Sequence, residues 1–177
     1  LADCREFATS FATAYYRAVA NAFNTTRCSG LYLGSRESWQ STPEILAVAN
    51  KYVDVYSISV YERPENVNWT FPGIDKPVMI SEFSYGATDR GMWNPGPIPT
   101  TSQADRAERM KELFTRALQS PKVVGAHWFQ YGDQHVTGRF DSENFNMGFL
   151  SVTDTPFPEM VAASRQIGAN QYLIRGS

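Results

Sequence analysis

Seven residues in the middle of the chain decide its fold class: Pro77-Val78-Met79-Ile80-Ser81-Glu82-Phe83. A short apolar run with a polar end is typical of a parallel strand that is buried between helices. Downstream, residues 103–120 repeat apolar positions at helical spacing among charged ones, which predicts an amphipathic helix. A strand followed by a helix is the repeating unit of α/β proteins.

The same alternation continues on both sides of this unit. Further strands are predicted at residues 30–34, 53–61 and 123–129, and further helices at 6–23, 43–52 and 158–167. Between the second and third strands only a loop with Trp69 and Pro72 is predicted, with room for a short helix. Four parallel β/α units are half of the eight that close a TIM barrel. The sequence therefore predicts a partial TIM barrel, with residues 1–177 forming a single domain.

Composition and charge exclude several function classes. The chain has 177 residues, a formal net charge of −2 and no run of Lys and Arg, so nucleic acid is not an expected partner. No apolar stretch reaches the roughly 18 residues of a membrane span, and a membrane partner is not expected either. Aromatic residues make up 14% of the chain, which suits sugar binding, although core packing accounts for many of them.

The cysteines and histidines predict neither a disulfide nor a metal site. Cys4 and Cys28 bracket the predicted helix 6–23, which is roughly 27 Å long, so we expect two free or buried thiols rather than a disulfide. His and Cys do not cluster at metal-ligand spacing, and there is no Gly-rich phosphate loop. We therefore expect no metal and no cofactor.

Polar and aromatic residues follow the predicted strands, where the reactive groups of β/α barrels stand. In chain order they are Arg36 and Glu37, Tyr61 and Glu62, Glu82 and Tyr85, then His127, Trp128, Gln130 and Tyr131. Glu82 differs from the others because it follows the apolar run 78–80 within its strand. A carboxylate buried there requires paired donors or a function. Glu37 and Glu62, taken singly, are as well explained as solvated loop positions.

Several segments resemble one enzyme family in the family's own order. Residues 76–84 resemble the nucleophile strand of clan A glycoside hydrolases. Residues 126–134, with 137–139 and 143–149, are similar to the eighth strand and following loop of β-agarase-like and β-galactosidase-like enzymes. Residues 31–36 and 53–61 resemble their fifth and sixth strands. The resemblance covers nearly the whole chain and implies the C-terminal half of a β/α barrel, strands five to eight.

The resemblance implies a retaining hydrolase of a β-linked galactan, agarose-like or glucan polysaccharide. Glu82 would be the nucleophile, and Tyr61 would hydrogen-bond to it and orient it. Sugar contacts would come from Arg36, Tyr85, His127, Trp128, Gln130, Asp133, Arg139 and Asn144, with Trp128 as the floor of the subsite. Three alternatives stay open. Trp128 packs in the barrel core, or Arg36 pairs with Glu37 or Glu62. The third is that the loop residues pair with each other instead of shaping the subsite: Asp133, Arg139, Glu143 and Asn144.

The chain departs from the family pattern at the general acid. Family members carry an acid/base Glu, usually after Asn, at the end of the fourth strand, and this chain is expected to begin after that point. Glu62 and Glu143 are the available substitutes on the same rim. We therefore expect a truncated fragment that is weakly active or inactive, derived from a parent enzyme that is secreted or periplasmic because polysaccharides are met outside cells.

Two other interpretations remain open. The first is a non-catalytic half barrel that binds saccharide or only self-associates. Four parallel strands leave two open edges and an apolar inner face, which a homodimer would cover by completing the barrel. The second is a lyase or isomerase with Glu82 as the base, for which the expected metal ligands or phosphate loop are missing.

Overall fold

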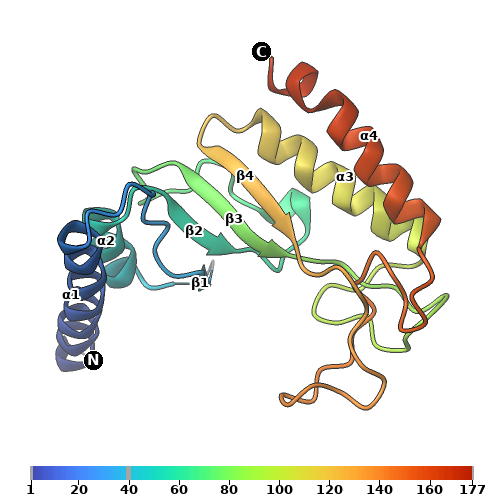
Figure 1. Ribbon diagram of the computed structural model, residues 1–177, viewed down its shortest axis with the longest axis horizontal. Helices are drawn as coiled ribbons and strands as arrows, with labels where there is room; N and C mark the ends of the chain where they lie inside the picture. Colours follow the sequence, from blue (N-terminus) through green and yellow to red (C-terminus); the bar gives the residue numbers. More distant parts are fainter. Residues whose placement is uncertain (1, 39–40, 177) are drawn as a thin grey trace.

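The computed structural model describes residues 2–38 and 41–176, and Figure 1 shows one curved parallel sheet flanked by helices. The four strands lie side by side in chain order, β1-β2-β3-β4. They are β1 (Glu37–Ser38), β2 (Tyr56–Ser59), β3 (Val78–Phe83) and β4 (Val123–Trp128). The helices are α1 (Ala2–Thr25), α2 (Pro43–Tyr52), the 3-10 helix η1 (Pro64–Asn66), α3 (Gln103–Gln119) and α4 (Pro158–Arg175). The chain is therefore an α/β protein with parallel strands, as predicted.

The first strand begins later than predicted. Residues 30–34 run beside the second strand without joining the ladder: the Tyr32 carbonyl accepts from Asp54 N at 2.9 Å, and Asp54 Oδ2 accepts from Tyr32 N at 2.8 Å. Gly34 then adopts a φ of 72°, which turns the backbone out of the extended conformation. The ladder forms only after this turn, where Glu37 pairs with Ile58.

The helix ends follow local chemistry. The helix α3 is capped by Ser102, whose side chain accepts from Asp105 N, and the Asp105 carboxylate accepts from Thr101 N at 3.0 Å. The last helix extends past its predicted end at residue 167 because Gly168 is tolerated within it. It stops at Gly176, which takes the left-handed conformation that closes helices, with a φ of 81°.

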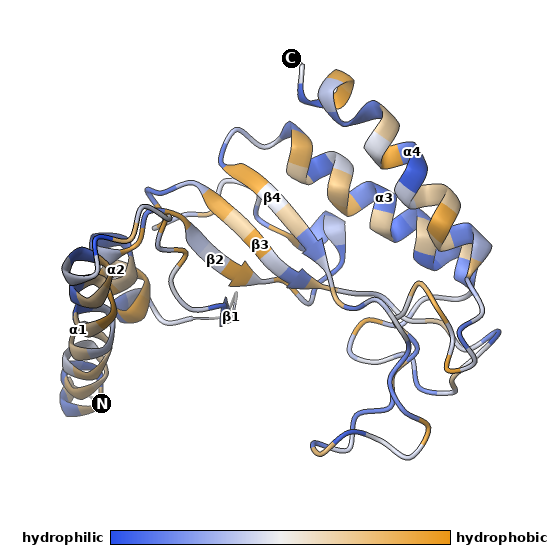
Figure 2. Cartoon of the chain, viewed as in Figure 1, coloured by the Kyte–Doolittle hydropathy of each residue, from blue (hydrophilic) through white to orange (hydrophobic). Residues whose placement is uncertain are grey.

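The core lies between the sheet and the helices that cover it. On β3, Val78, Ile80 and Phe83 are buried, and they pack with Met110 and Leu113 of α3. Figure 2 shows apolar colour along β3 and β4, whereas colours alternate along α3, as in a helix with one face toward the core. The strands therefore end at a fixed edge, from which loops 84–102 and 129–157 extend together (Figure 1).

Other predictions concern the thiols and the helices. Cys4 and Cys28 are free and exposed, which agrees with the expected absence of a disulfide. Within residues 2–38 and 41–176, no helix has the length and apolarity needed to cross a bilayer. No three His, Cys, Asp or Glu side chains of this same portion are grouped to hold a metal ion.

Candidate functional site

Glu82 lies near the carboxyl end of β3 and is held by donors from two other segments. Its Oε1 accepts from the hydroxyl of Tyr61, which follows β2, and its Oε2 accepts from Arg36 Nη1 at 2.8 Å. The Glu82 side chain is 17% exposed and that of Arg36 is 62% exposed, so the guanidinium reaches a mostly buried carboxylate from solvent. Both carboxylate oxygens are therefore engaged, and the side chain is fixed in direction.

Tyr61 keeps its proton under ordinary conditions. Burial, followed by the hydrogen bond to Glu82, raises the pKa of the Tyr61 phenol well above its usual value. The Tyr61 hydroxyl therefore remains a hydrogen-bond donor to Glu82 at neutral pH. Arg36 was also considered as an ion-pair partner of Glu37 or Glu62. In the structure its partner is Glu82.

A cavity of about 370 Å³ opens beside Glu82. Its walls come from the rim before and after the strands and from the two long loops: Arg36, Tyr61, Glu82, Pro97, Phe129, Arg139, Glu143, Phe145 and Met147. Two carboxylates, two guanidiniums and aromatic surface face one space. Such a mixture of apolar walls and a few charged groups is what small-molecule sites present.

The loop after β4 is clamped in place by two charged side chains, of which Asp133 is partly buried. Arg106 of α3 is fully buried, and its guanidinium donates to Asn146 Oδ1 at 2.9 Å and to the Gly148 carbonyl. From the other side, Asp133 accepts from Met147 N at 3.0 Å and from Gly148 N at 2.8 Å. Burial lowers the pKa of Arg106 to about 10 and raises the pKa of Asp133. Oxygen atoms of Asn146 and Gly148 thus accept hydrogen bonds from the cation Arg106. The backbone N–H groups of Met147 and Gly148 donate to the anion Asp133.

The clamp also requires a glycine. A Cβ added at Gly148 would lie 2.2 Å from Asp133 N and 2.4 Å from the Leu150 carbonyl oxygen, so only glycine fits. Next to the clamp, Gln134 accepts from Phe145 N at 2.7 Å and donates to Glu143 Oε2 at 2.8 Å. These contacts place Glu143, Phe145 and Met147 against the cavity.

Four of the predicted site residues meet at this cavity: Arg36, Tyr61, Glu82 and Arg139. Two others are engaged within the loops instead. The Asp133 carboxylate is occupied by the clamp, and Asn144 Oδ1 accepts from Asn94 Nδ2 at 2.9 Å. For Arg139 the predicted pairing with Glu143 is also present, at 3.4 Å, and a pair that was not predicted joins Arg139 to Asp141 at 2.5 Å.

Trp128 does not line the cavity, and the neighbouring Phe129 does. The Trp128 ring packs edge-on against Phe83 with centroids 5.3 Å apart, and its indole N–H donates to the Met147 carbonyl at 2.8 Å. Successive side chains of an extended segment point to opposite sides, so only one of these two aromatic residues can face the cavity. For Trp128 the structure therefore agrees with the alternative in which the ring packs against the core.

Tyr85, His127 and Gln130 also lie outside the cavity. The Tyr85 ring is buried and its hydroxyl donates to the Glu62 carbonyl at 3.1 Å. His127 is exposed and lines a hollow along the edge strand β4 and helices α3 and α4. Gln130 Nε2 donates to the Gly132 carbonyl at 2.9 Å, which turns this amide back onto its own loop. Their predicted sugar contacts remain predictions.

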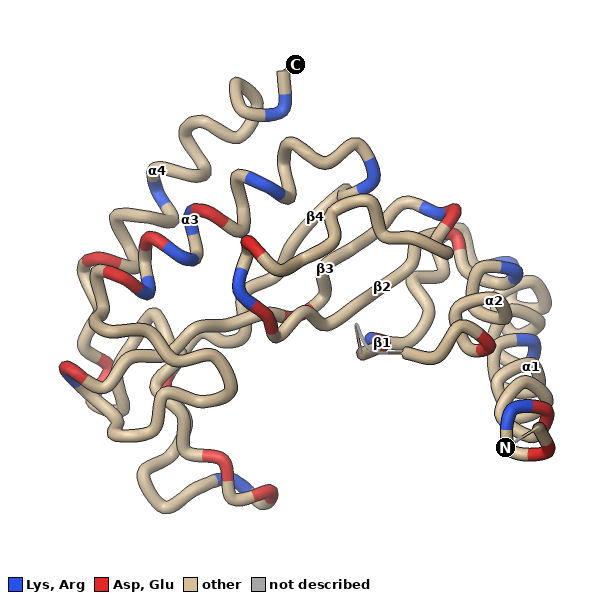
Figure 3. Tube along the Cα trace, turned by 180° about the vertical axis from the view of Figure 1, so that it is seen from behind, with Lys and Arg blue, Asp and Glu red and all other residues tan. Residues whose placement is uncertain are grey.

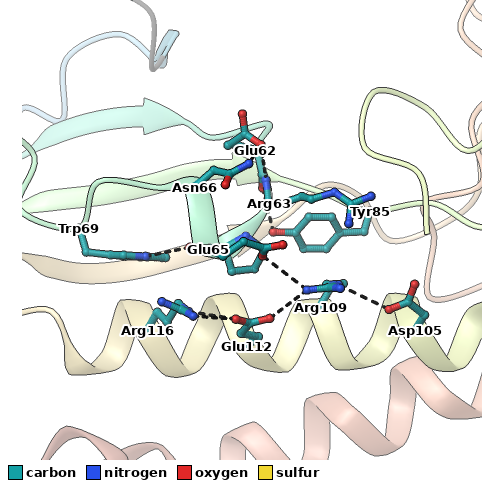
Figure 4. Close-up of polar contacts among 11 residues, drawn as sticks. Glu62, Arg63, Glu65, Asn66, Trp69, Tyr85, Asp105, Arg109, Glu112 and Arg116 are labelled. Carbon is teal, nitrogen blue, oxygen red and sulfur yellow. Dashed lines mark hydrogen bonds and ion pairs between the residues drawn. The ribbon is translucent and has the colours of Figure 1, made fainter. Parts of the chain in front are cut away.

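Glu62 does not line the cavity, and Figure 4 shows the contacts that it makes instead. Its carboxylate accepts from Arg63 N at 2.7 Å and from Asn66 Nδ2 at 3.1 Å, so it caps the η1 turn. Beneath it, Arg109 bridges Glu65 and Glu112 across η1 and α3. Figure 3 shows that charged residues gather on helices and loop tips, with few along the strands. This ion-pair array is a solvated surface rather than a site.

Sequence reasoning did not assign cavity positions to Pro97, Phe129, Phe145 and Met147. Phe129 directly follows a strand, and that position was the available signal. The other three lie in long loops, whose course depends on distant contacts such as the one between Arg106 and Gly148.

Comparisons with known proteins point to one group of enzymes. No family model matches the chain. Beta-agarase A from Vibrio sp. (strain JT0107) is 39% identical over 180 residues, covering 97% of this chain and 18% of the relative. Beta-agarase B from the same organism is 37% identical over 178 residues, covering 98% of this chain and 19% of the relative. The chain thus spans about a fifth of the length of these curated relatives.

A solved structure described as an exo-beta-agarase is similar in sequence and shape. It is 41% identical, with a TM-score of 0.89, and the match covers 98% of this chain and 24% of that one. The homologues of this chain are therefore beta-agarases, and the similarity extends over almost all of its residues.

Proposed function

We propose that this chain is part of a retaining glycoside hydrolase that cleaves β-linked agarose, with Glu82 as its nucleophile. The observation that carries the proposal is Glu82 itself: a mostly buried carboxylate, held by Tyr61 and Arg36, beside an open cavity. The similarity to beta-agarases supports the substrate class. A carboxylate fixed in direction beside a sugar-sized space is what nucleophilic attack at an anomeric carbon requires.

In this mechanism one oxygen of Glu82 forms a bond to the anomeric carbon as the glycosidic C–O bond breaks. A second carboxyl group gives its proton to the leaving oxygen, and water then releases the sugar from Glu82. Tyr61 and Arg36 hold the carboxylate during the approach, and the phenol remains protonated because of its raised pKa. Phe129 and Phe145 supply apolar surface for the ring of the sugar.

The general acid is proposed to come from a part of the enzyme that this chain does not span. The two carboxyl groups of a retaining enzyme lie about 5–5.5 Å apart. Glu143 lines the cavity, but its side chain is engaged by Gln134 and Arg139, which makes it a poor proton donor. Because a positioned acid contributes roughly 10²–10⁴-fold, we expect weak or no turnover of agarose by the chain alone.

We further propose that the four strands correspond to strands five to eight of a β/α barrel. Parallel strands in chain order, with helices between them, support this proposal. Exposed apolar side chains gather toward both edges of the sheet, Leu31 and Leu33 near β1 and Val124 on β4. In the isolated chain a second copy would cover these edges, so light scattering is expected to give twice the chain mass. A monomer at micromolar concentration would exclude this dimer.

The proposed nucleophile is tested with a substrate that needs no general acid. An activated 2-fluoro-β-galactoside with a dinitrophenolate leaving group is expected to label the chain once, at Glu82, as read by mass spectrometry of its peptides. Glu82→Gln is expected to abolish labelling, whereas Glu143→Gln, which alters the other cavity carboxylate, retains it. Labelling of another residue, or equal labelling of Glu82→Gln, would refute the assignment.

A further inference from the structure

The loop after β4 presents an aromatic ring to solvent at its tip. Phe140 is 98% exposed, although it sits in a closed turn. Arg139 N donates to the Glu143 carbonyl at 2.9 Å, and Ser142 N donates to the Arg139 carbonyl at 2.9 Å. The turn is further closed by Glu143 N, which donates to Asp141 Oδ1 at 3.2 Å. Phe140 is therefore held outward by a hydrogen-bonded turn, and its ring contributes no core burial.

Arg139 connects this ring to the cavity. Its guanidinium lies 5.8 Å from the ring centroid of Phe129 and 5.8 Å from that of Phe140. Phe129 and Arg139 both line the cavity that contains Glu82. The Phe129 ring, the Arg139 guanidinium and the Phe140 ring thus form one continuous surface, which starts in the cavity and ends in solvent. Asp141, at 2.5 Å from Arg139 Nη2, fixes the guanidinium in the middle of it.

The chemistry of this surface matches a sugar polymer. A pyranose ring has a C–H face that packs on an aromatic ring and hydroxyls that accept from a guanidinium. The turn carries one guanidinium and two carboxylates, those of Asp141 and Glu143, so its charge suits a neutral polymer better than a sulfated one. A polysaccharide that reaches Glu82 must also extend past it, and this surface leads outward from the same cavity.

We infer that Arg139 and Phe140 form an outer sugar subsite, which binds a unit of the polysaccharide beyond the one that lies against Glu82. The inference rests on the proposed function and adds to it a residue that selects for chain length. Short substrates would occupy the cavity alone, whereas longer ones would also cover the exposed ring of Phe140.

The test compares agarose oligosaccharides of two lengths by isothermal titration calorimetry on the full chain. Phe140→Ala is expected to bind an agarose hexasaccharide roughly tenfold more weakly than the unaltered chain, because half-burying a Phe side chain is worth about one decade of affinity. Its affinity for the disaccharide is expected to be unchanged. Phe140→Trp keeps an aromatic face and is expected to restore hexasaccharide binding.

Tyr131→Ala is the matched control, since Tyr131 is a 74% exposed aromatic residue of the same loop that does not line the cavity. Its hexasaccharide affinity is expected to equal that of the unaltered chain. Equal hexasaccharide binding by Phe140→Ala, or an equal loss for both sugars, would overturn the outer subsite while leaving the role of Glu82 intact. If the unaltered chain binds neither sugar, the proposed substrate class itself fails, and the outer subsite with it.

Discussion

Replacing Arg106 with methionine is expected to destabilise the protein severely and to release the loop that borders the cavity. Methionine keeps an unbranched apolar stem in the buried space but removes the guanidinium. Two acceptors then lose their donor, Gln103 Oε1 at 2.7 Å and the Gly148 carbonyl. Asn146 Oδ1 loses one of its two donors and keeps Gln103 Nε2 at 2.9 Å. Asp133, on the other side of the clamp, loses the nearest compensating charge.

The magnitude follows from this inventory. Each buried acceptor left without a partner costs about 1–3 kcal/mol, and removing one side of a buried charge network costs about 3–5 kcal/mol in total. The side chain of Arg106 is fully buried, so no solvent enters to offset the loss. For a domain of this size each kcal/mol lowers Tm by roughly 2–4 °C, which predicts a fall of roughly 10–15 °C.

Thermal unfolding followed by circular dichroism measures this effect, and tryptophan fluorescence reports the site, since the Arg106 guanidinium lies 5.6 Å from the Trp128 ring. Arg109→Met is the control: it removes a guanidinium from the same helix, but one whose ion pairs are partly exposed (Figure 4) and worth about 0–1 kcal/mol each. A variant at Arg106 that unfolds within about 1 kcal/mol of the unaltered chain would refute the clamp.

Three further changes test other parts of the structure. Tyr61→Phe removes a donor to the proposed nucleophile, so labelling by the activated fluorogalactoside is expected to slow by roughly 10–100-fold in a stopped assay. The pKa of Asp105 is lowered by the hydrogen bond from the Thr101 N–H, so its stabilising effect is full above about pH 4 and is lost as pH falls through the lower folded pKa. Urea unfolding between pH 4 and 2 should therefore depend less on pH in Asp105→Asn, and an equal slope would contradict this. Gly148→Ala places a Cβ against Asp133 N and is expected to cost more than about 2 kcal/mol, whereas Gly168→Ala, with open space around it on α4, is expected to stabilise by about 0.5–1 kcal/mol.

The elements that sequence predicted well are those in which local pattern and burial agree. The run Val78-Met79-Ile80 lies in β3, and the period of residues 103–120 produced α3 almost to its ends. The first strand was misplaced because residues 30–34 are apolar and yet turn at Gly34. An apolar run predicts burial or contact with a neighbouring segment. It does not predict a positive φ at a single glycine, and here that angle decides where strand pairing begins.

The site residues that could be predicted are likewise those with a local sequence signal. Glu82 was identifiable because a carboxylate within an apolar strand requires a reason. Tyr61 follows β2, whereas Arg36 directly precedes β1 and was predicted from the misplaced strand at 30–34. The choice between Trp128 and Phe129 was not predictable, because the pairing of β3 with β4 shifts between Ile80 and Phe83 and changes which side chain faces the cavity. The clamp joins Arg106 to Asn146, 40 residues away, and leaves no local signature in the sequence.

The chain-order arrangement of the strands has a consequence for how the protein assembles. Every hydrogen-bonded pair of strands joins two strands that follow one another in the chain: β1 with β2, β2 with β3 and β3 with β4. Each newly made strand can add to the one before it, so no strand pairing has to close a loop longer than one β/α unit. Structure can then grow along the chain as it leaves the ribosome, one β/α unit at a time.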